Sequence, residues 1–139
     1  MNAKRILVWL NDTTVSIKAL QEAIVLAKEC GAEIHALSVE KVPRYPAIAG
    51  EVIETAEASA GYQKLVDAAQ EVAKQAGANL QLHLEFGSKA KKAKEFIEKN
   101  GVDLLVVGYA GHSTLYEWIA GDVFKPLVRL APCLVLVVK

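Results

Sequence analysis

Short apolar segments alternate along the chain with longer segments in which apolar residues recur every three or four positions. The first run, residues 6–10, is continuously apolar, as expected for a strand that is covered on both faces of a sheet. Residues 79–86 instead alternate between apolar and polar side chains, which is typical of an edge strand with one wetter face. Further strands are predicted at residues 33–39, 103–107 and 134–138.

Helices are predicted between these strands, the first two from the helical spacing of their apolar residues and the last two from signals at their ends. Gly31 supplies the positive φ that commonly ends a helix, Ser88 is expected to be an N-cap, and Pro132 stops the last helix. The predicted helices are residues 15–30, a long segment that follows the loop at 41–50 and ends at Gly77, residues 88–101, and residues 122–130.

Five strands that alternate with four helices predict a single α/β domain over residues 1–139. In such a domain the strands form a parallel sheet with right-handed connections, and helices cover both faces. The length fits one domain. Open parallel sheets bind their ligands beyond the carboxyl ends of the strands, where the strand order reverses, so candidate chemistry is expected there.

The amino-acid composition limits the kinds of molecule that the protein is expected to bind. Sixteen Lys and Arg residues balance sixteen Asp and Glu residues, and a net charge of zero argues against a dedicated binder of nucleic acid or of an anionic membrane surface. The apolar runs are too short for a signal peptide or a membrane span. Cys30 and Cys133 have no metal-ligand spacing and predict free thiols in a reducing compartment. We therefore expect a cytoplasmic domain that is free to self-associate.

The segment after the fourth predicted strand carries the candidate chemistry. It contains Gly108 and Gly111 and reaches Gly121 and Asp122 at the predicted start of the last helix. Glycines allow backbone N–H groups to approach an anion, and a helix amino terminus adds positive potential. The spacing fits neither a Walker loop nor the dinucleotide fingerprint. Taken alone, glycines of this kind more often serve only a turn.

Four segments of the chain together resemble the universal stress protein family. They are the run that opens at Ile6 and residues 31–35, 103–108 and 131–138. Family members that bind ATP carry glycine, two residues, glycine, nine residues, glycine, then serine or threonine, and Gly108, Gly111 and Gly121 match that spacing. The resemblance implies strand order 3-2-1-4-5, ATP bound as Mg-ATP at the point of reversal, and dimers that pair their last strands, here Leu134 to Val138.

The resemblance also implies which positions would contact an adenine nucleotide. They are Leu10, Asn11, Asp12, Thr13, Val39, Gly108, Gly111, His112, Gly121, Asp122 and Val123. No nucleophile elbow, no Cys–His pair at a recognisable spacing and no carboxylate pair placed by a motif is visible in the sequence, so we expect no enzyme, or at most a slow ATPase. His35 and His83 lack neighbours for a metal site and are expected to be structural.

Several residues depart from the ATP-binding pattern. Asp122 stands where the family has serine or threonine, and its carboxylate would repel a phosphate charge 4 Å away by about 4 kcal/mol at an effective dielectric constant of ~20. Asn11 replaces an aspartate that can accept from an adenine amino group, and it keeps an oxygen acceptor without the charge. Trp9 replaces a small residue or proline, and its indole could fill the space of an adenine ring or stack on one. Pro126, expected at the fourth position of the last helix, would remove the first internal hydrogen bond of that helix.

Three hypotheses follow from these residues. The first is a cytoplasmic stress-response module that acts by ligand binding and dimerisation, with weak or absent ATP binding. The alternative is an ATP-binding member with slow hydrolysis or autophosphorylation at Thr13, Ser113 or Thr114, supported by the complete glycine spacing. The third is a dimerisation scaffold whose pocket is filled by Trp9. The departures from the ATP-binding pattern favour the first, because site residues decide function where the fold does not.

Overall fold

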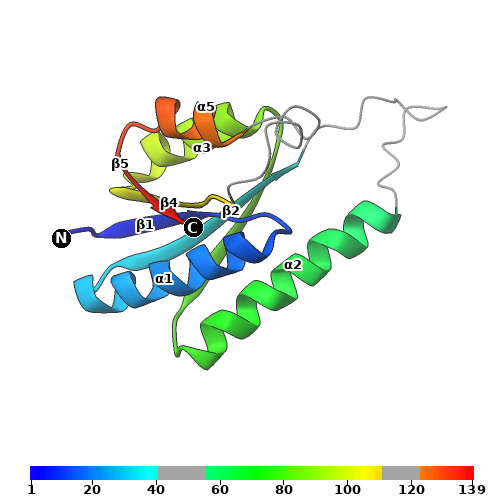
Figure 1. Cartoon of the computed structure of the whole chain (residues 1–139), viewed down its shortest axis with the longest axis horizontal. Coiled ribbons are helices and arrows are strands. Elements are labelled where there is room, and N and C mark those ends of the chain that lie inside the picture. The colour runs from blue at the N-terminus through cyan, green and yellow to red at the C-terminus, as the bar shows by residue number, and fades with distance from the viewer. Residues whose placement is uncertain (41–55, 111–122) are drawn as a thin grey trace.

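The computed structural model describes residues 1–40, 56–110 and 123–139 of the chain. In these residues five parallel strands form one sheet in the order β3-β2-β1-β4-β5, which confirms the predicted architecture and order (Figure 1). The strands are β1 (Arg5–Trp9), β2 (Glu33–Glu40), β3 (Leu80–Phe86), β4 (Leu104–Gly108) and β5 (Leu134–Val138).

Helices cover both faces of the sheet, as predicted. α1 and α2 lie on one face, and α3 and α5 lie on the other (Figure 1). The described helices are α1 (Thr14–Cys30), α2 (Ala56–Gln75), α3 (Lys89–Asn100) and α5 (Phe124–Leu130). The element boundaries agree with the predicted ones to within two residues wherever the structure describes both, and β5 matches its predicted range in full.

Apolar side chains of the strands alternate between two separate cores. Along β1 and just beyond it, Ile6, Val8 and Leu10 pack toward α1 and α2, whereas Leu7 and Trp9 pack toward α3 and α5. All five of these side chains are buried, as expected for a central strand covered on both faces. The alternation fixes which residues of β1 can reach either side of the sheet.

The observed helix ends show which capping residues could be identified from the sequence. α1 ends at Gly31 with φ of 67°, and α3 ends at Gly101 with φ of 63°, both in the left-handed region that favours glycine. The N-cap residue of α1 is Thr13, whose hydroxyl oxygen accepts from the backbone N–H of Ser16. Ser88 occupies the N-cap position of α3 as predicted, but its side chain makes no capping hydrogen bond.

The start of the last helix corrects the expectation for Pro126. α5 begins at Phe124, so Pro126 is the third helical residue and not the fourth. Backbone N–H groups in the first turn have no partner within the helix, and a proline there removes no internal bond. The first internal bond of α5 is intact, since the N–H of Leu127 donates to the carbonyl oxygen of Val123 at 3.0 Å.

The two edges of the sheet differ in character. At β3, polar and apolar side chains alternate and all are half-buried or exposed, in agreement with the predicted edge. At β5, the edge strand is wholly apolar and exposes Leu134 (64%) and Val137 (37%). Single exposed apolar residues are ordinary on protein surfaces, but here they lie together on one edge strand, whose outer side has no neighbouring strand among the described residues.

Candidate functional site

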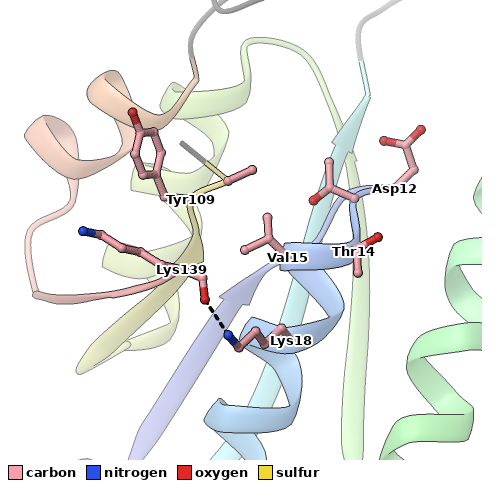
Figure 2. A pocket seen from close by; sticks show the side chains of 8 residues that line it. Asp12, Thr14, Val15, Lys18, Tyr109 and Lys139 are labelled. Atoms are coloured by element: carbon pink, nitrogen blue, oxygen red, sulfur yellow. Dashed lines mark hydrogen bonds between the residues drawn. The ribbon is translucent and has the colours of Figure 1, made fainter. Parts of the chain in front are cut away.

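A pocket of about 640 Å³ lies at the carboxyl ends of the strands, between the start of α1 and the ends of β4 and β5 (Figure 2). It is lined by Asp12, Thr13, Thr14, Val15, Lys18, Tyr109, Ala110 and Lys139. β1 and β4 are neighbours in the sheet, and the chain continues from them in opposite directions, to β2 and to β5. The pocket therefore lies at the reversal of strand order, where open parallel sheets bind ligands.

The turn from β1 into α1 is held by its own side chains. The side-chain oxygen Oδ1 of Asn11 accepts from the backbone N–H of Thr13 at 3.1 Å and from its hydroxyl at 2.5 Å. The backbone N–H of Asn11 donates to the Ser16 hydroxyl at 2.9 Å. The oxygen that the resemblance assigns to an adenine amino group is thus already bonded to Thr13.

The contact positions suggested by the sequence are distributed between the pocket and the core. Asp12 and Thr13 line the pocket. Leu10 and Val39 are buried to 2% and 3% exposure in the two cores on opposite faces of the sheet. Val123 packs against the core under α3 and α5.

Other positions named from the sequence lie outside the described residues. They are Gly111, His112, Ser113, Thr114, Gly121 and Asp122. The described wall of the pocket comes from the first turns of α1, the turn before it, and the residues just after β4 and β5.

Gly108 is required by a close approach of the chain to itself. A Cβ atom placed on Gly108 would lie 2.6 Å from the carbonyl oxygen of Val15 and 2.8 Å from its carbonyl carbon. Real Cβ atoms do not approach backbone atoms so closely. The end of β4 therefore packs directly on the first turn of α1. This close packing requires a glycine at position 108 whether or not the segment also binds an anion or forms a turn.

Sequence reasoning missed two lysines of the pocket wall. The ammonium Nζ of Lys18 donates to a backbone oxygen of Lys139 at 2.6 Å (Figure 2). Beside this bond, the backbone N–H of Tyr109 donates to the carbonyl oxygen of Val138 at 2.7 Å. Lys18 could have been found from the sequence, because it is a cation about one turn into the helix that begins at the strand reversal.

Tyr109 adds an aromatic wall on the side of α5. The centroid of its ring lies 4.6 Å from that of Phe124, at an interplanar angle of 32°. Such a tilted pair is a common arrangement of neighbouring aromatic rings. The described wall of the pocket thus combines threonine hydroxyl groups, the Asp12 carboxylate, two lysines and an aromatic ring.

Trp9 lies in the core. Its side chain is 5% exposed and packs in the apolar cluster under α3 and α5, together with Leu7 and Leu105. The described pocket wall does not include it. This corrects the hypothesis that the indole fills the pocket, because the alternation of β1 directs Trp9 to the face opposite Val8 and Leu10.

His35 and His83 form a hydrogen-bonded pair under α3. Nδ1 of His35 lies 3.0 Å from Nε2 of His83, and both rings contact the ring of Phe96. Nε2 of His35 lies 3.2 Å from a carboxylate oxygen of Glu33. Burial lowers the pKa of His83, the charge of His35 lowers it further, and Glu85 partly opposes the shift. Within the described residues, no group of three or more His, Cys, Asp or Glu side chains is arranged to hold a metal ion.

The family comparison covers nearly the whole chain. The model of the universal stress protein family matches residues 2–139. A universal stress protein of Methanocaldococcus jannaschii is 30% identical over 140 residues, which is 98% of this chain and 82% of that protein. Universal stress protein YxiE of Bacillus subtilis is 30% identical over 145 residues, with 97% of this chain and 98% of that protein covered.

Solved structures share the fold. The universal stress protein UspA from Lactobacillus plantarum superposes with a TM-score of 0.80 at 24% identity, covering 100% of this chain and 99% of that chain. A universal stress protein in complex with cAMP gives 0.74 at 22% identity, covering 100% and 98%. One from Archaeoglobus fulgidus in complex with dAMP gives 0.70 at 16% identity, covering 100% of both chains.

Proposed function

This chain belongs to the universal stress protein family, and from that premise we propose that it is a cytoplasmic binding module that takes an adenine nucleotide at the ends of β1 and β4 and dimerises through β5. The observation that carries the proposal is the pocket at the strand reversal, with a lysine ammonium and two threonines in its wall. In the described residues, no helix is long and apolar enough to cross a membrane.

The pocket suits a ligand with one phosphate better than one with three. Lys18 is the ammonium on α1 that faces the space between α1 and the end of β5, whereas Asp12 adds a negative charge to the same wall (Figure 2). The sequence adds a second carboxylate, Asp122, after the third glycine. Each further phosphate charge meets this repulsion, so we propose that ATP binds weakly or not at all.

The nucleotides bound in the solved structures also favour a ligand with one phosphate. The two ligands named there, cAMP and dAMP, each carry a single phosphate on an adenine nucleoside. The side-chain oxygen of Asn11 already accepts two hydrogen bonds from Thr13. Recognition of an adenine ring would therefore depend on other polar groups of this turn. Stabilisation by ligand follows from mass action and is therefore measurable without an activity assay.

Titration of the purified protein with AMP and with Mg-ATP, followed by thermal unfolding, tests the proposed function. Ligand at 100 times its dissociation constant stabilises a protein by about 2.7 kcal/mol, which raises the unfolding midpoint by several degrees. We expect a shift with AMP, a much smaller one with Mg-ATP, and a larger Mg-ATP response in Asp122→Ser. No shift with any adenine nucleotide would overturn the proposal.

Dimerisation through β5 rests on the exposed apolar edge of that strand. Leu134 and Val137 are exposed there, and Val128 and Leu130 of α5, the helix that precedes β5, are exposed as well. Light scattering should give a molar mass of twice the 15.0 kDa of one chain. The change Leu134→Glu should shift the mass toward the monomer, whereas Val25→Glu, at an exposed apolar residue of α1, should leave it unchanged. A wild-type mass of one chain would disprove this part.

Slow ATP hydrolysis or autophosphorylation is the second candidate, because Gly108, Gly111 and Gly121 keep the complete spacing of the ATP-binding members. Phosphoryl transfer would be expected at Thr13, Ser113 or Thr114. The Thr13 hydroxyl already donates to Asn11 and accepts from Ser16, which does not favour it as an acceptor. Nucleotide retained through purification, with radiolabel from ATP appearing on the protein, would place this candidate first.

A further inference from the structure

We infer that the first two turns of α3 form a docking surface for an acidic segment of a partner protein. The surface consists of Lys89, Lys91, Lys92 and Lys94, and it is called the lysine surface below. α3 begins just after β3 and packs against β2 and β3, whereas the pocket of the proposed function lies toward β4 and β5. The lysine surface is therefore separate from that pocket, and the inference does not depend on nucleotide binding.

The helices on the two faces of the sheet differ in charge, although the chain as a whole is neutral (Figure 1). α3 and α5 together carry seven basic residues and two acidic ones. α1 and α2, on the other face, carry four basic residues and five acidic ones. The lysine surface supplies most of the excess on the basic face. Concentrated charge of this kind attracts an oppositely charged partner, over a screening length of about 8 Å at physiological ionic strength.

The stability of α3 does not explain the lysine surface. Cations near the start of a helix face the positive end of its dipole, and α3 has no acidic residue in its first turn. Two pairs among the four lysines are three residues apart, the spacing at which like charges on a helix repel each other. Lys99, by contrast, lies in the last turn, where the dipole stabilises a cation. Because the four lysines oppose helix formation, we attribute them to binding.

The helix neutralises only part of this positive charge. Nζ of Lys92 lies 3.4 Å from a carboxylate oxygen of Glu95, and Nζ of Lys94 lies 3.7 Å from one of Glu98. Both pairs are partly exposed to water, which weakens an ion pair. Within the described residues, the other two lysines of the surface have no carboxylate oxygen within 4 Å of their ammonium groups. Those two ammonium groups can therefore pair with carboxylates of another molecule.

The residues around the lysine surface favour a protein partner over a nucleic acid. Glu95 and Glu98 follow the lysines on the same helix and would repel the continuous negative charge of a phosphate backbone. A protein segment can place neutral or basic side chains opposite these glutamates. The side chain of Ser88 makes no capping hydrogen bond, and backbone N–H groups at a helix start accept carboxylates. A segment with spaced Asp or Glu residues therefore fits the surface.

Titration with short peptides, followed by nuclear magnetic resonance of the protein, tests the inference. The probe is a ten-residue peptide in which glutamate and serine alternate, and its control has glutamine in place of every glutamate. We expect the glutamate peptide alone to shift the backbone amide signals of residues 88–95. Its affinity should fall severalfold between 50 and 300 mM salt, because salt screens exposed charges.

Two double variants locate the binding surface. Lys89→Gln with Lys91→Gln removes the two lysines that have no carboxylate partner among the described residues, and the affinity for the glutamate peptide should fall about fivefold. Lys64→Gln with Lys74→Gln removes the same charge from exposed positions on α2 and should bind the peptide as the wild type does. Equal affinities in the two double variants would overturn the inference, and so would the absence of any shift with the glutamate peptide.

Two further measurements exclude other roles for the lysines. Thermal unfolding of Lys89→Gln with Lys91→Gln should give a midpoint equal to that of the wild type or higher, because the helix loses charges that oppose its dipole. A lower midpoint would overturn the inference, since the lysines would then serve folding. A ten-nucleotide oligothymidylate should bind more weakly than the glutamate peptide. Tighter binding of the oligonucleotide would identify a nucleic-acid surface and would also overturn the inference.

Discussion

The two ends of the parallel sheet satisfy their polar groups in different ways. At the amino ends of the strands, the Asp103 carboxylate accepts the backbone N–H groups of Lys4 at 2.7 Å and Arg5 at 2.9 Å. At the carboxyl ends, the Lys18 ammonium in the pocket wall donates to a backbone oxygen of Lys139 at 2.6 Å. At the amino end a side-chain carboxylate holds backbone N–H groups of the neighbouring strand, whereas at the carboxyl end a side-chain ammonium lies in the wall of an open pocket.

This difference predicts that residues at the two ends affect different properties, the free energy of unfolding at one end and ligand affinity at the other. Changes at the amino end should lower the free energy of unfolding and leave ligand affinity intact. Changes at Lys18 should do the reverse. Gly108 is the exception, because it lies at the carboxyl end but is fixed by packing against Val15.

The largest expected effect on stability is that of Gly108→Ala. The new Cβ would lie 2.6 Å from a backbone oxygen, and backbone cannot move aside as a flexible side chain does. Overpacking of this kind typically costs about 1–3 kcal/mol, and we expect a loss at or above the upper end. Urea denaturation measures it. The matched change Gly61→Ala, in a helix with nothing within 4 Å of the new Cβ, should stabilise by up to ~1 kcal/mol. A loss below about 1 kcal/mol in Gly108→Ala would contradict the close approach.

A smaller loss is expected for Asp103→Ala at the amino end. Two backbone N–H groups lose their acceptor, but they are exposed and water can replace it, so we expect about 1 kcal/mol. Asp67→Ala, at an exposed carboxylate on α2 that accepts a hydrogen bond from the Gln63 side chain, should have almost no effect. Equal losses in the two variants would contradict the structural role of Asp103.

The same carboxylate gives a pH dependence with a defined sign. Hydrogen bonds from the backbone of Lys4 and Arg5 lower the pKa of Asp103 in the folded protein. Its contribution to stability is therefore complete above the ordinary carboxyl pKa and is lost as the pH falls through the lowered value. Asp103→Ala should show less loss of stability than the wild type on acidification below about pH 4.

Thr13→Ala comes next, at the start of α1. Loss of an N-cap side chain typically costs about 1 kcal/mol, and here it also removes a hydrogen-bond donor to Asn11. Thr14 is the matched control, because it lines the same pocket and is the first helical residue rather than the cap. Thr14→Ala should change the free energy of unfolding by less than about 0.5 kcal/mol. Comparable losses in both variants would show that the cap contributes little.

The sequence predicted the elements of this fold better than the contacts between them. Periodicity located the strands, and Gly31 and Gly101 marked helix ends because that signal is local. The strand order came from family resemblance, since periodicity carries no information on which strands pair. The approach of Gly108 to Val15 and the bond from Lys18 to Lys139 join segments 93 and 121 residues apart, so no local pattern contains them.

Trp9 shows the same limit at a single residue. Its presence near the strand reversal suggested a role in the pocket, but neighbouring residues of a strand face opposite sides of the sheet. Which side is open to a ligand depends on where α1 and the ends of β4 and β5 come together. That arrangement is a tertiary property, and it places the indole in the core under α3 and α5.

The smallest expected effect concerns His83, at the inner end of a polar chain that starts at the amino end. Arg5 pairs with Glu33, Glu33 lies beside His35, and His35 is hydrogen-bonded to His83. Around His83, β2 presents His35, β3 presents Glu85, and α3 presents the ring of Phe96. In a neutral pair one ring nitrogen donates and the other accepts, whereas two protonated rings have only donors.

Because the folded protein lowers the pKa of His83, the unfolded chain binds the proton more readily. This contribution to stability is therefore complete above the ordinary histidine pKa of about 6.5 and falls as the pH drops toward the lowered value. We expect the unfolding midpoint of the wild type to decrease between about pH 7.5 and pH 5.5. His83→Gln should flatten that decrease, and His112→Gln, at the remaining histidine of the chain, should not. Parallel pH profiles for the wild type and His83→Gln would show that protonation of this histidine pair does not limit the stability of the protein in this pH range.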